Sequence, residues 1–211
     1  MSRNLQHIVQ DALSAVHSHP HHDLNLGYRQ AIWNAYGSHN DEPATTKQTI
    51  AHQNRTRLAI LTARSVLSIW DCTWQNNRTP HHLLRIAEHL IQRMDRADTA
   101  RDEGETFLTW LESAMVLYEY KPPLYAGFSA VKALFVAVED EKFDSGAIDY
   151  QCTDADIDPY DLDTSFFACA AYAHGSVWES ESDAAKRRDF WEWWLKHAVP
   201  KAQSAVVTYD C

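Results

Sequence analysis

The chain has 211 residues, a formal net charge of −10 at pH 7, and 45% hydrophobic and 23% charged residues. This composition excludes a disordered chain, and the acidic balance argues against general binding of nucleic acid, which carries the same sign of charge. Six glycines, fewer than the eight tryptophans, are too few for the many tight turns of a β-sandwich or barrel.

The first part of the chain carries apolar residues at helical spacing. They predict a first helix over residues 3–17. Asp23 is expected to cap a second helix that ends at Gly37, and residues 38–44 read as a loop. A long third helix is predicted to follow and to end near Trp70.

Three basic residues are predicted to lie on the solvent-facing side of this long helix: Arg55, Arg57 and Arg64. Two further amphipathic helices are predicted after it, one that begins at Pro80 and one that spans about residues 98–118.

Two later segments are apolar around their whole circumference, namely residues 122–140 and 166–173. A helix that is apolar on every side is buried, so we expect these two helices at the centre with the amphipathic helices around them. No run alternates with period two for long enough to form a sheet. The sequence therefore predicts one compact all-α domain over residues 1–211, with eight or nine helices.

A final helix is predicted from Asp183 to just before Pro200. Most of its aromatic residues fall within one arc and are expected in the core. Trp193 falls outside that arc. It is either covered by the tail at residues 206–209 or exposed as an anchor for a partner.

The segment between the two central helices holds nearly all of the net charge. Residues 139–163 contain ten acidic side chains and a single base, Lys142. The segment contains Gly146 and Pro159 and no helical stripe, so we expect a long acidic loop. It is either a solvated loop in which some aspartates cap helices, as Asp163 would, or a surface that binds a basic partner.

Metal-binding patterns are incomplete in this sequence. The aspartates at 154, 156 and 158 resemble the opening of a calcium loop, but Pro159 and Ser165 stand where that loop needs glycine and glutamate. Two histidine groups, at residues 17–22 and 81–89, also lack the remaining ligands of a metal site. We therefore predict no cofactor, no metal and no catalytic residue.

The location is predicted from the absence of targeting signals. The chain shows no apolar block of a signal peptide and no run of about 18 apolar residues that would span a membrane. The four cysteines form no C-x-x-C pair. We expect a cytoplasmic protein with reduced thiols and no membrane association.

Three stretches in the last part of the chain carry a family resemblance. They are the run from Arg187 to Leu195 closed by Ala198-Val199-Pro200, the acidic stretch 154–163 with the alanine-rich helix after it, and Leu124-Tyr125-Ala126-Gly127. These stretches resemble the fifth numbered family of bacterial immunity proteins. The resemblance implies an all-α protein that is encoded beside a polymorphic toxin and protects the producing cell by binding the toxin domain.

The leading hypothesis is a non-enzymatic inhibitor of a cognate toxin domain, such as a basic nuclease. Two alternatives stay open: a metal-dependent helical hydrolase that uses the aspartate-rich loop, and an interaction protein without a toxin partner. The oligomeric state is not predicted. We predict the partner-binding residues from charge and from the position of one tryptophan: Asp149, Asp154, Asp156, Asp158, Asp161 and Trp193.

Overall fold

A computed structural model describes residues 3–37 and 47–204 of the chain. These residues form helices and contain no strand, in a compact arrangement that confirms the predicted all-α class. The loop predicted at 38–44 and the tail at 206–209 lie outside the described residues. None of the helices within this part of the chain has the length and apolar character needed to cross a bilayer.

The described helices agree closely with the predicted order. They are α1 (Arg3–Ser18), α2 (Leu26–Ala35), α3 (Ile50–Arg64), α4 (Leu67–Thr73), α5 (Thr79–Gln92), α6 (Ala97–Leu117), α7 (Pro122–Glu139), α8 (Thr164–Tyr172), α9 (Ala184–Trp193) and α10 (Val199–Ala202). Two short 3-10 turns, η1 (Asp154–Asp156) and η2 (Pro159–Asp161), precede α8, and a π-helical turn, η3 (Trp194–Ala198), joins α9 to α10.

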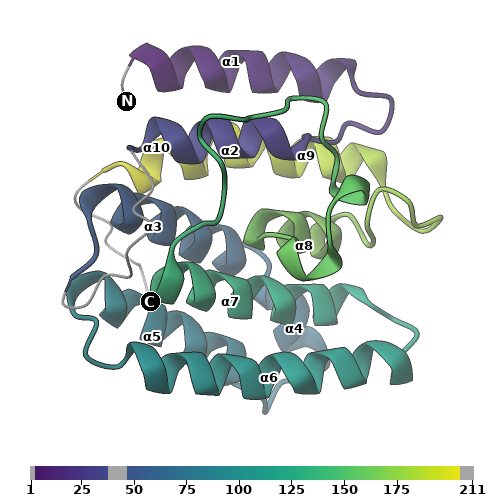
Figure 1. Cartoon of the computed structure of the whole chain (residues 1–211). Coiled ribbons are helices and arrows are strands. Elements are labelled where there is room, and N and C mark those ends of the chain that lie inside the picture. Colours follow the sequence, from purple (N-terminus) through teal and green to yellow (C-terminus); the bar gives the residue numbers. More distant parts are fainter. Residues whose placement is uncertain (1–2, 38–46, 205–211) are drawn as a thin grey trace.

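Helix α7 lies at the centre of the molecule, as its apolar circumference predicts (Figure 1). It packs against α3, α4, α5, α6 and α8. The buried hydroxyl of Ser129 donates to the backbone carbonyl of Thr164 at 3.0 Å, so this hydroxyl is paired although it lies in the core. Helix α8 is the second buried helix and packs on α7, α3 and α9.

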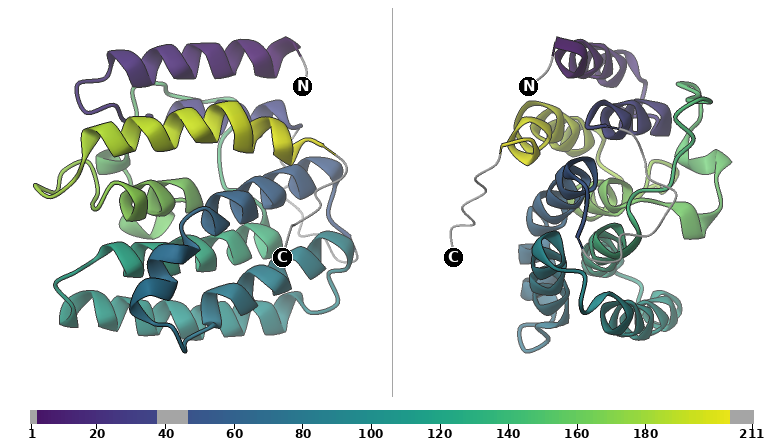
Figure 2. Two further views of the ribbon diagram at one scale, coloured as in Figure 1. Left: turned by 180° about the vertical axis from the view of Figure 1, so that it is seen from behind. Right: turned by 60° about the vertical axis from the view of Figure 1, so that its left-hand side comes forward.

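The amphipathic helices cover these two on opposite sides. Helices α5 and α6 pack on one side of α7, while α1, α2 and α9 form a layer beyond α3 and α8 (Figure 1). Figure 2 shows the same layers from behind and from one side. In the side view, α2 lies between α9 and the chain that joins α7 to α8.

The start of α2 and the long third helix differ from the prediction. Helix α2 begins after Asn25, and Asp23 accepts a hydrogen bond from Trp191 Nε1 at 3.0 Å instead of capping it. The predicted long helix is broken into α3 and α4. At the break, Ser65 Oγ donates to the carbonyl of Thr62 at 2.7 Å, and such side-chain bonds compete with the helical backbone pattern.

The last helix continues beyond Pro200, where the prediction ended it. A proline inside an α-helix removes one N–H group and its ring clashes with the carbonyl four residues before. The π-helical turn η3 precedes Pro200, and the N–H of Val199 bonds to the carbonyl of Trp194, five residues back. In this wider turn the backbone hydrogen bond spans five residues instead of four, and the helical chain continues from α9 through η3 into α10 without a loop.

Candidate functional site

We name residues 139–163, which join α7 to α8, the acidic segment. It leaves the end of α7, crosses over α2 and returns to α8 (Figure 1). The backbone N–H of Leu26 donates to the carbonyl of Cys152 at 3.1 Å, and Asn25 Nδ2 donates to the carbonyl of Tyr150 at 3.0 Å. The rings of Tyr28 and Tyr150 meet edge to face at 4.9 Å. The segment is therefore held along the first turns of α2.

Gly27 lets the two backbones approach each other at this point. A Cβ atom at this position would lie 2.2 Å from the carbonyl oxygen of Asp149 and 2.7 Å from Cα of Tyr150. Only a residue without a side chain fits this contact, because the neighbouring atoms belong to backbone and cannot rotate away.

Two buried arginines fix the ends of the acidic segment. At its start, Arg55 donates from Nε and Nη2 to the two carboxylate oxygens of Asp140, at 2.6 and 2.7 Å. Nη1 of Arg55 also donates to the carbonyls of Trp33 and Gly37, at 3.0 and 2.9 Å. Arg55 is only 1% exposed, so its predicted place on the solvent side is wrong. A bidentate carboxylate and two carbonyls replace the water that its guanidinium loses on burial.

At the other end of the segment, Arg29 of α2 pairs with both Asp154 and Asp163. The guanidinium is fully buried, and its Nη1 lies 2.7 Å from Asp163 Oδ2. Asp163 also caps α8, as predicted: its Oδ1 accepts from the backbone N–H groups of Ser165 and Phe166 at 2.6 and 3.1 Å. Burial raises the pKa of Asp154, although the charge of Arg29 favours its ionised form.

The structure separates the five predicted aspartates of this segment into two groups. Asp149, Asp156, Asp158 and Asp161 are exposed, and they lie on the outer side of the segment. Asp154 is buried against Arg29, which sets it apart from the exposed aspartates that could contact a partner directly. Three of the exposed carboxylates also accept a backbone N–H near their own position: Asp149 from Gln151, Asp156 from Thr153, and Asp158 from Tyr160. These bonds hold the charges in place.

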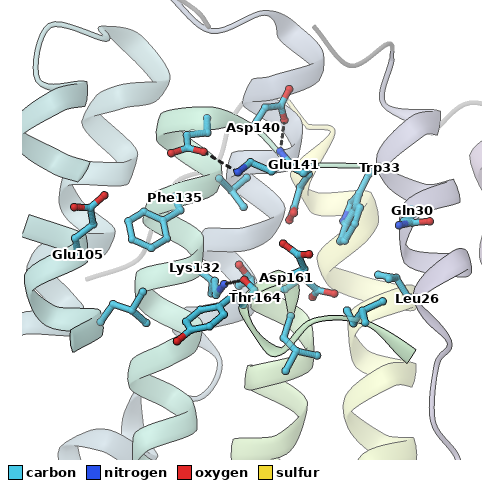
Figure 3. Close-up of a pocket in the computed structure, with 18 residues that line it drawn as sticks. Leu26, Gln30, Trp33, Glu105, Lys132, Phe135, Asp140, Glu141, Asp161 and Thr164 are labelled. Carbon is cyan, nitrogen blue, oxygen red and sulfur yellow. Dashed lines mark hydrogen bonds and ion pairs between the residues drawn. The ribbon is translucent and has the colours of Figure 1, made fainter. Parts of the chain in front are cut away.

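A cavity of about 610 Å³ lies beneath the acidic segment, between it and helices α2, α6 and α7. Figure 3 shows its walls, with Trp33 on the α2 side and Phe135 on the α7 side. Two lysines line the cavity, Lys132 and Lys142. Six carboxyl groups also line it: Glu105, Glu139, Asp140, Glu141, Asp161 and Asp163. Glu139, Asp140 and Asp163 already pair with arginines of the chain, which leaves the carboxyl groups of Glu105, Glu141 and Asp161 to attract a cation.

Glu141 is the most unusual of these carboxyl groups. It is 9% exposed, and among the described residues no hydrogen bond or ion pair involves its carboxyl group, whose oxygens keep slight contact with solvent. Figure 3 shows it pointing into the cavity between Phe135 and Trp33. Burial, with the charges of Asp163 and Asp140, raises its pKa well above the ordinary value. Glu141 was not among the predicted contacts, because nothing in the sequence pattern separates it from the nine other acidic residues of the segment.

The sequence of the chain is similar to one known protein family over most of its length. A model of the family described as Immunity protein Imm5 matches residues 9–201. The chain belongs to the Imm5 family of immunity proteins. The match extends the predicted resemblance from the last part of the chain to most of its length. A comparison with curated proteins finds no match. Membership in the Imm5 family gives the chain a toxin-neutralising function and a toxin as its partner.

Several histidines of the two predicted groups lie in separate pairs with carboxylates in this Imm5 chain. His17 Nε2 lies 2.9 Å from Glu192, His82 Nε2 lies 2.9 Å from Glu103, and His89 Nε2 lies 3.0 Å from Asp95. Within residues 3–37 and 47–204, no group of three or more histidine, cysteine, aspartate or glutamate side chains is arranged to hold a metal ion.

Trp193, the sixth predicted contact, lies apart from the acidic segment. It is half-buried, and its ring centre is 5.8 Å from that of Phe190. In the side view of Figure 2, α2 separates α9 from the acidic segment. The structure therefore does not bring Trp193 together with the exposed aspartates of this family member.

Proposed function

We propose that this Imm5 protein neutralises its toxin by covering a basic surface of the toxin domain with the outer side of the acidic segment. The observation that carries the proposal is the placement of Asp149, Asp156, Asp158 and Asp161 on the exposed side of a segment whose ends are held by buried arginines. A toxin domain that attracts phosphate groups, such as a nuclease, presents the positively charged surface that these aspartates would bind.

The fixed backbone of the segment supports tight binding. A flexible acidic loop would lose conformational freedom when a partner bound, and that loss would oppose association. Here the contacts of Gly27, Arg29 and Arg55 hold the segment before any partner arrives. The exposed carboxylates would then mainly speed encounter and select a basic partner.

Inhibition by occupying a surface requires no chemistry from the immunity protein. We infer that the chain acts as a stoichiometric, non-enzymatic inhibitor in the cytoplasm of the cell that produces the toxin. Trp193 remains a predicted contact, and it would take part if the toxin reached around α2 to α9.

The test uses the toxin domain encoded by the gene beside this one. We expect the wild-type chain to protect cells that express this domain and to bind it one to one in a calorimetric titration. A well-folded toxin domain that neither binds nor is neutralised would contradict the proposed function.

The role of the acidic segment is tested by a variant with four substitutions: Asp149→Asn, Asp156→Asn, Asp158→Asn and Asp161→Asn. A matched control variant changes the net charge equally at exposed acids elsewhere: Asp11→Asn, Asp95→Asn, Glu181→Gln and Asp189→Asn. We expect the first variant to bind at least about tenfold more weakly and the control to bind like the wild type. Equal affinities of the two variants would remove the acidic segment from the interface.

A further inference from the structure

We propose that the cavity beneath the acidic segment is a socket for one arginine side chain of the toxin, with Glu141 as the carboxylate that receives it. This inference rests on the proposed function and adds to it the kind of group that the toxin inserts. The outer aspartates would attract the partner, and the socket would hold it.

Glu141 is a nearly buried carboxylate without a partner among the described residues. A buried ionised carboxylate is costly unless a cation or hydrogen-bond donors compensate it. Glu141 has neither among the described residues, and its carboxyl group points into the cavity (Figure 3). The other buried carboxyl groups of the acidic segment all face an arginine of the chain: Asp140 faces Arg55, and Asp154 and Asp163 face Arg29.

The two ammonium groups that line the cavity already have partners. The ammonium group of Lys132 donates to the backbone carbonyl of Tyr160, and that of Lys142 lies 3.3 Å from Glu139. Neither forms an ion pair with Glu141. The nearby charges of Lys132, Arg29 and Arg55 act on Glu141 without direct contact, so we infer that a cation in contact with it comes from another molecule.

The size and the lining of the cavity favour an organic cation over a metal ion. A volume of about 610 Å³ is far larger than a single ion needs, and the described residues contain no three-ligand metal group. The walls include Trp33, Phe135 and the exposed ring of Tyr160. A guanidinium group stacks on aromatic rings, binds carboxylates through two parallel hydrogen bonds, and is more weakly hydrated than an ammonium group. These properties favour arginine over lysine.

The location of the socket fits the proposed interface. Asp161 belongs both to the exposed side of the acidic segment and to the lining of the cavity. A toxin that covers the segment would thus bring a side chain directly above Glu141. Charged groups at the buried centre of an interface contribute far more to affinity than those at its rim.

The main experiment compares the affinity of Glu141→Gln with that of Asp144→Asn for the toxin domain. Asp144 is an exposed acid of the same segment that does not line the cavity, so it serves as the matched control. We expect Glu141→Gln to raise the dissociation constant at least about 30-fold, and Asp144→Asn to change it less than about threefold. Equal effects of the two substitutions would overturn the socket and leave the proposed function standing.

A second experiment tests the socket without any toxin. Propylguanidinium is added to the free protein, and the NMR signal of the Trp33 indole is followed. Propylurea is the uncharged control and butylammonium the lysine-like one. We expect a saturable shift with propylguanidinium that Glu141→Gln abolishes, a weaker shift with butylammonium, and none with propylurea.

The two experiments separate the possible failures. If the wild-type chain does not bind the toxin, the proposed function is wrong, and the NMR titration alone decides whether the cavity takes a guanidinium group. If the three small molecules give equal shifts, or Glu141→Gln keeps the shift of the wild type, the socket is wrong. An equal response to butylammonium and propylguanidinium would contradict the assignment to arginine.

Discussion

Arg29 and Asp154, which stand 125 residues apart in the chain, form an ion pair that is closed to solvent. The same guanidinium contacts Asp163. One arginine of α2 therefore holds the end of the acidic segment and, through Asp163, the first turn of α8. The acidic segment therefore has a buried side, which packs on α2 and α8, and an exposed side that a partner can reach.

Removal of this cation is predicted to destabilise the protein strongly. The substitution Arg29→Met keeps the aliphatic part of the side chain but leaves Asp154 and Asp163 buried without a positive charge. Breaking a buried pair in this way costs about 3–5 kcal/mol. Urea denaturation measures the loss, with Arg85→Met, at an exposed arginine of α5, as the control that changes stability by less than about 0.5 kcal/mol. A similar small change for both variants would contradict the anchoring role.

The close contact at Gly27 predicts a position-specific effect of adding one methyl group. Gly27→Ala places Cβ against the backbone of Asp149, so the acidic segment has to move. We expect a loss of about 1–3 kcal/mol in the free energy of unfolding, and weaker toxin binding. Gly146→Ala is the control, because its nearest neighbour is a side-chain oxygen of Asp144 at 3.3 Å. An unchanged stability of Gly27→Ala would show that the segment is not held there.

Glu141 is predicted to reduce the stability of the free protein as the pH rises. Its pKa in the folded state lies well above the ordinary value, so the folded protein holds this proton more tightly than the unfolded chain does. Ionisation above about pH 4.5 therefore favours unfolding. Besides burial, the pKa of Glu141 depends on the charged groups around it, which come from the helices and from the acidic segment. They are Asp140, Asp163, Arg29, Arg55 and Lys132.

Thermal unfolding of the wild type and of Glu141→Gln at several pH values measures this effect. We expect equal melting temperatures near about pH 4, and a higher value for Glu141→Gln by roughly 2–4 °C near about pH 8, which corresponds to about 1 kcal/mol. Asp154, whose pKa burial also raises, is present in both proteins and cancels in the difference. A difference that is constant with pH, or of the opposite sign, would contradict the assignment.

Divalent cations are predicted to leave the stability unchanged. The metal-dependent alternative needs three or more converging ligands, and residues 3–37 and 47–204 present no such group. We expect Mg²⁺, Mn²⁺ or Zn²⁺ to shift the melting temperature of untagged protein by less than about 1 °C. A saturable increase with any of them would favour the hydrolase over the inhibitor.

The core helices were predictable because their signals are local. The apolar circumference of 122–140 and 166–173 predicts burial whatever the neighbours are, and α7 and α8 are buried. The cap at Asp163 depends only on the next three residues, and it is present. The fold class follows from such features.

The inner side of the acidic segment was not predictable, since its partners are distant in sequence. Arg55 and Asp140 are 85 residues apart, and helical spacing alone places Arg55 among exposed residues. Neither the burial of Asp154 nor the unpaired state of Glu141 can be read from a row of acidic residues. The sequence shows where the charge is concentrated, and tertiary contacts decide which charges reach a partner.

The most direct test of the central claim is the rate at which the chain associates with the toxin domain, measured by stopped flow between about 50 and 200 mM salt. Electrostatic attraction between exposed charges weakens as salt shortens the screening length. We expect the wild-type rate to fall at least about fivefold over this range, and the four-asparagine variant of the acidic segment to associate more slowly with a flatter salt dependence. The control variant with equal net charge would behave like the wild type. A wild-type rate independent of salt, or equal rates for the two variants, would contradict recognition through the acidic segment.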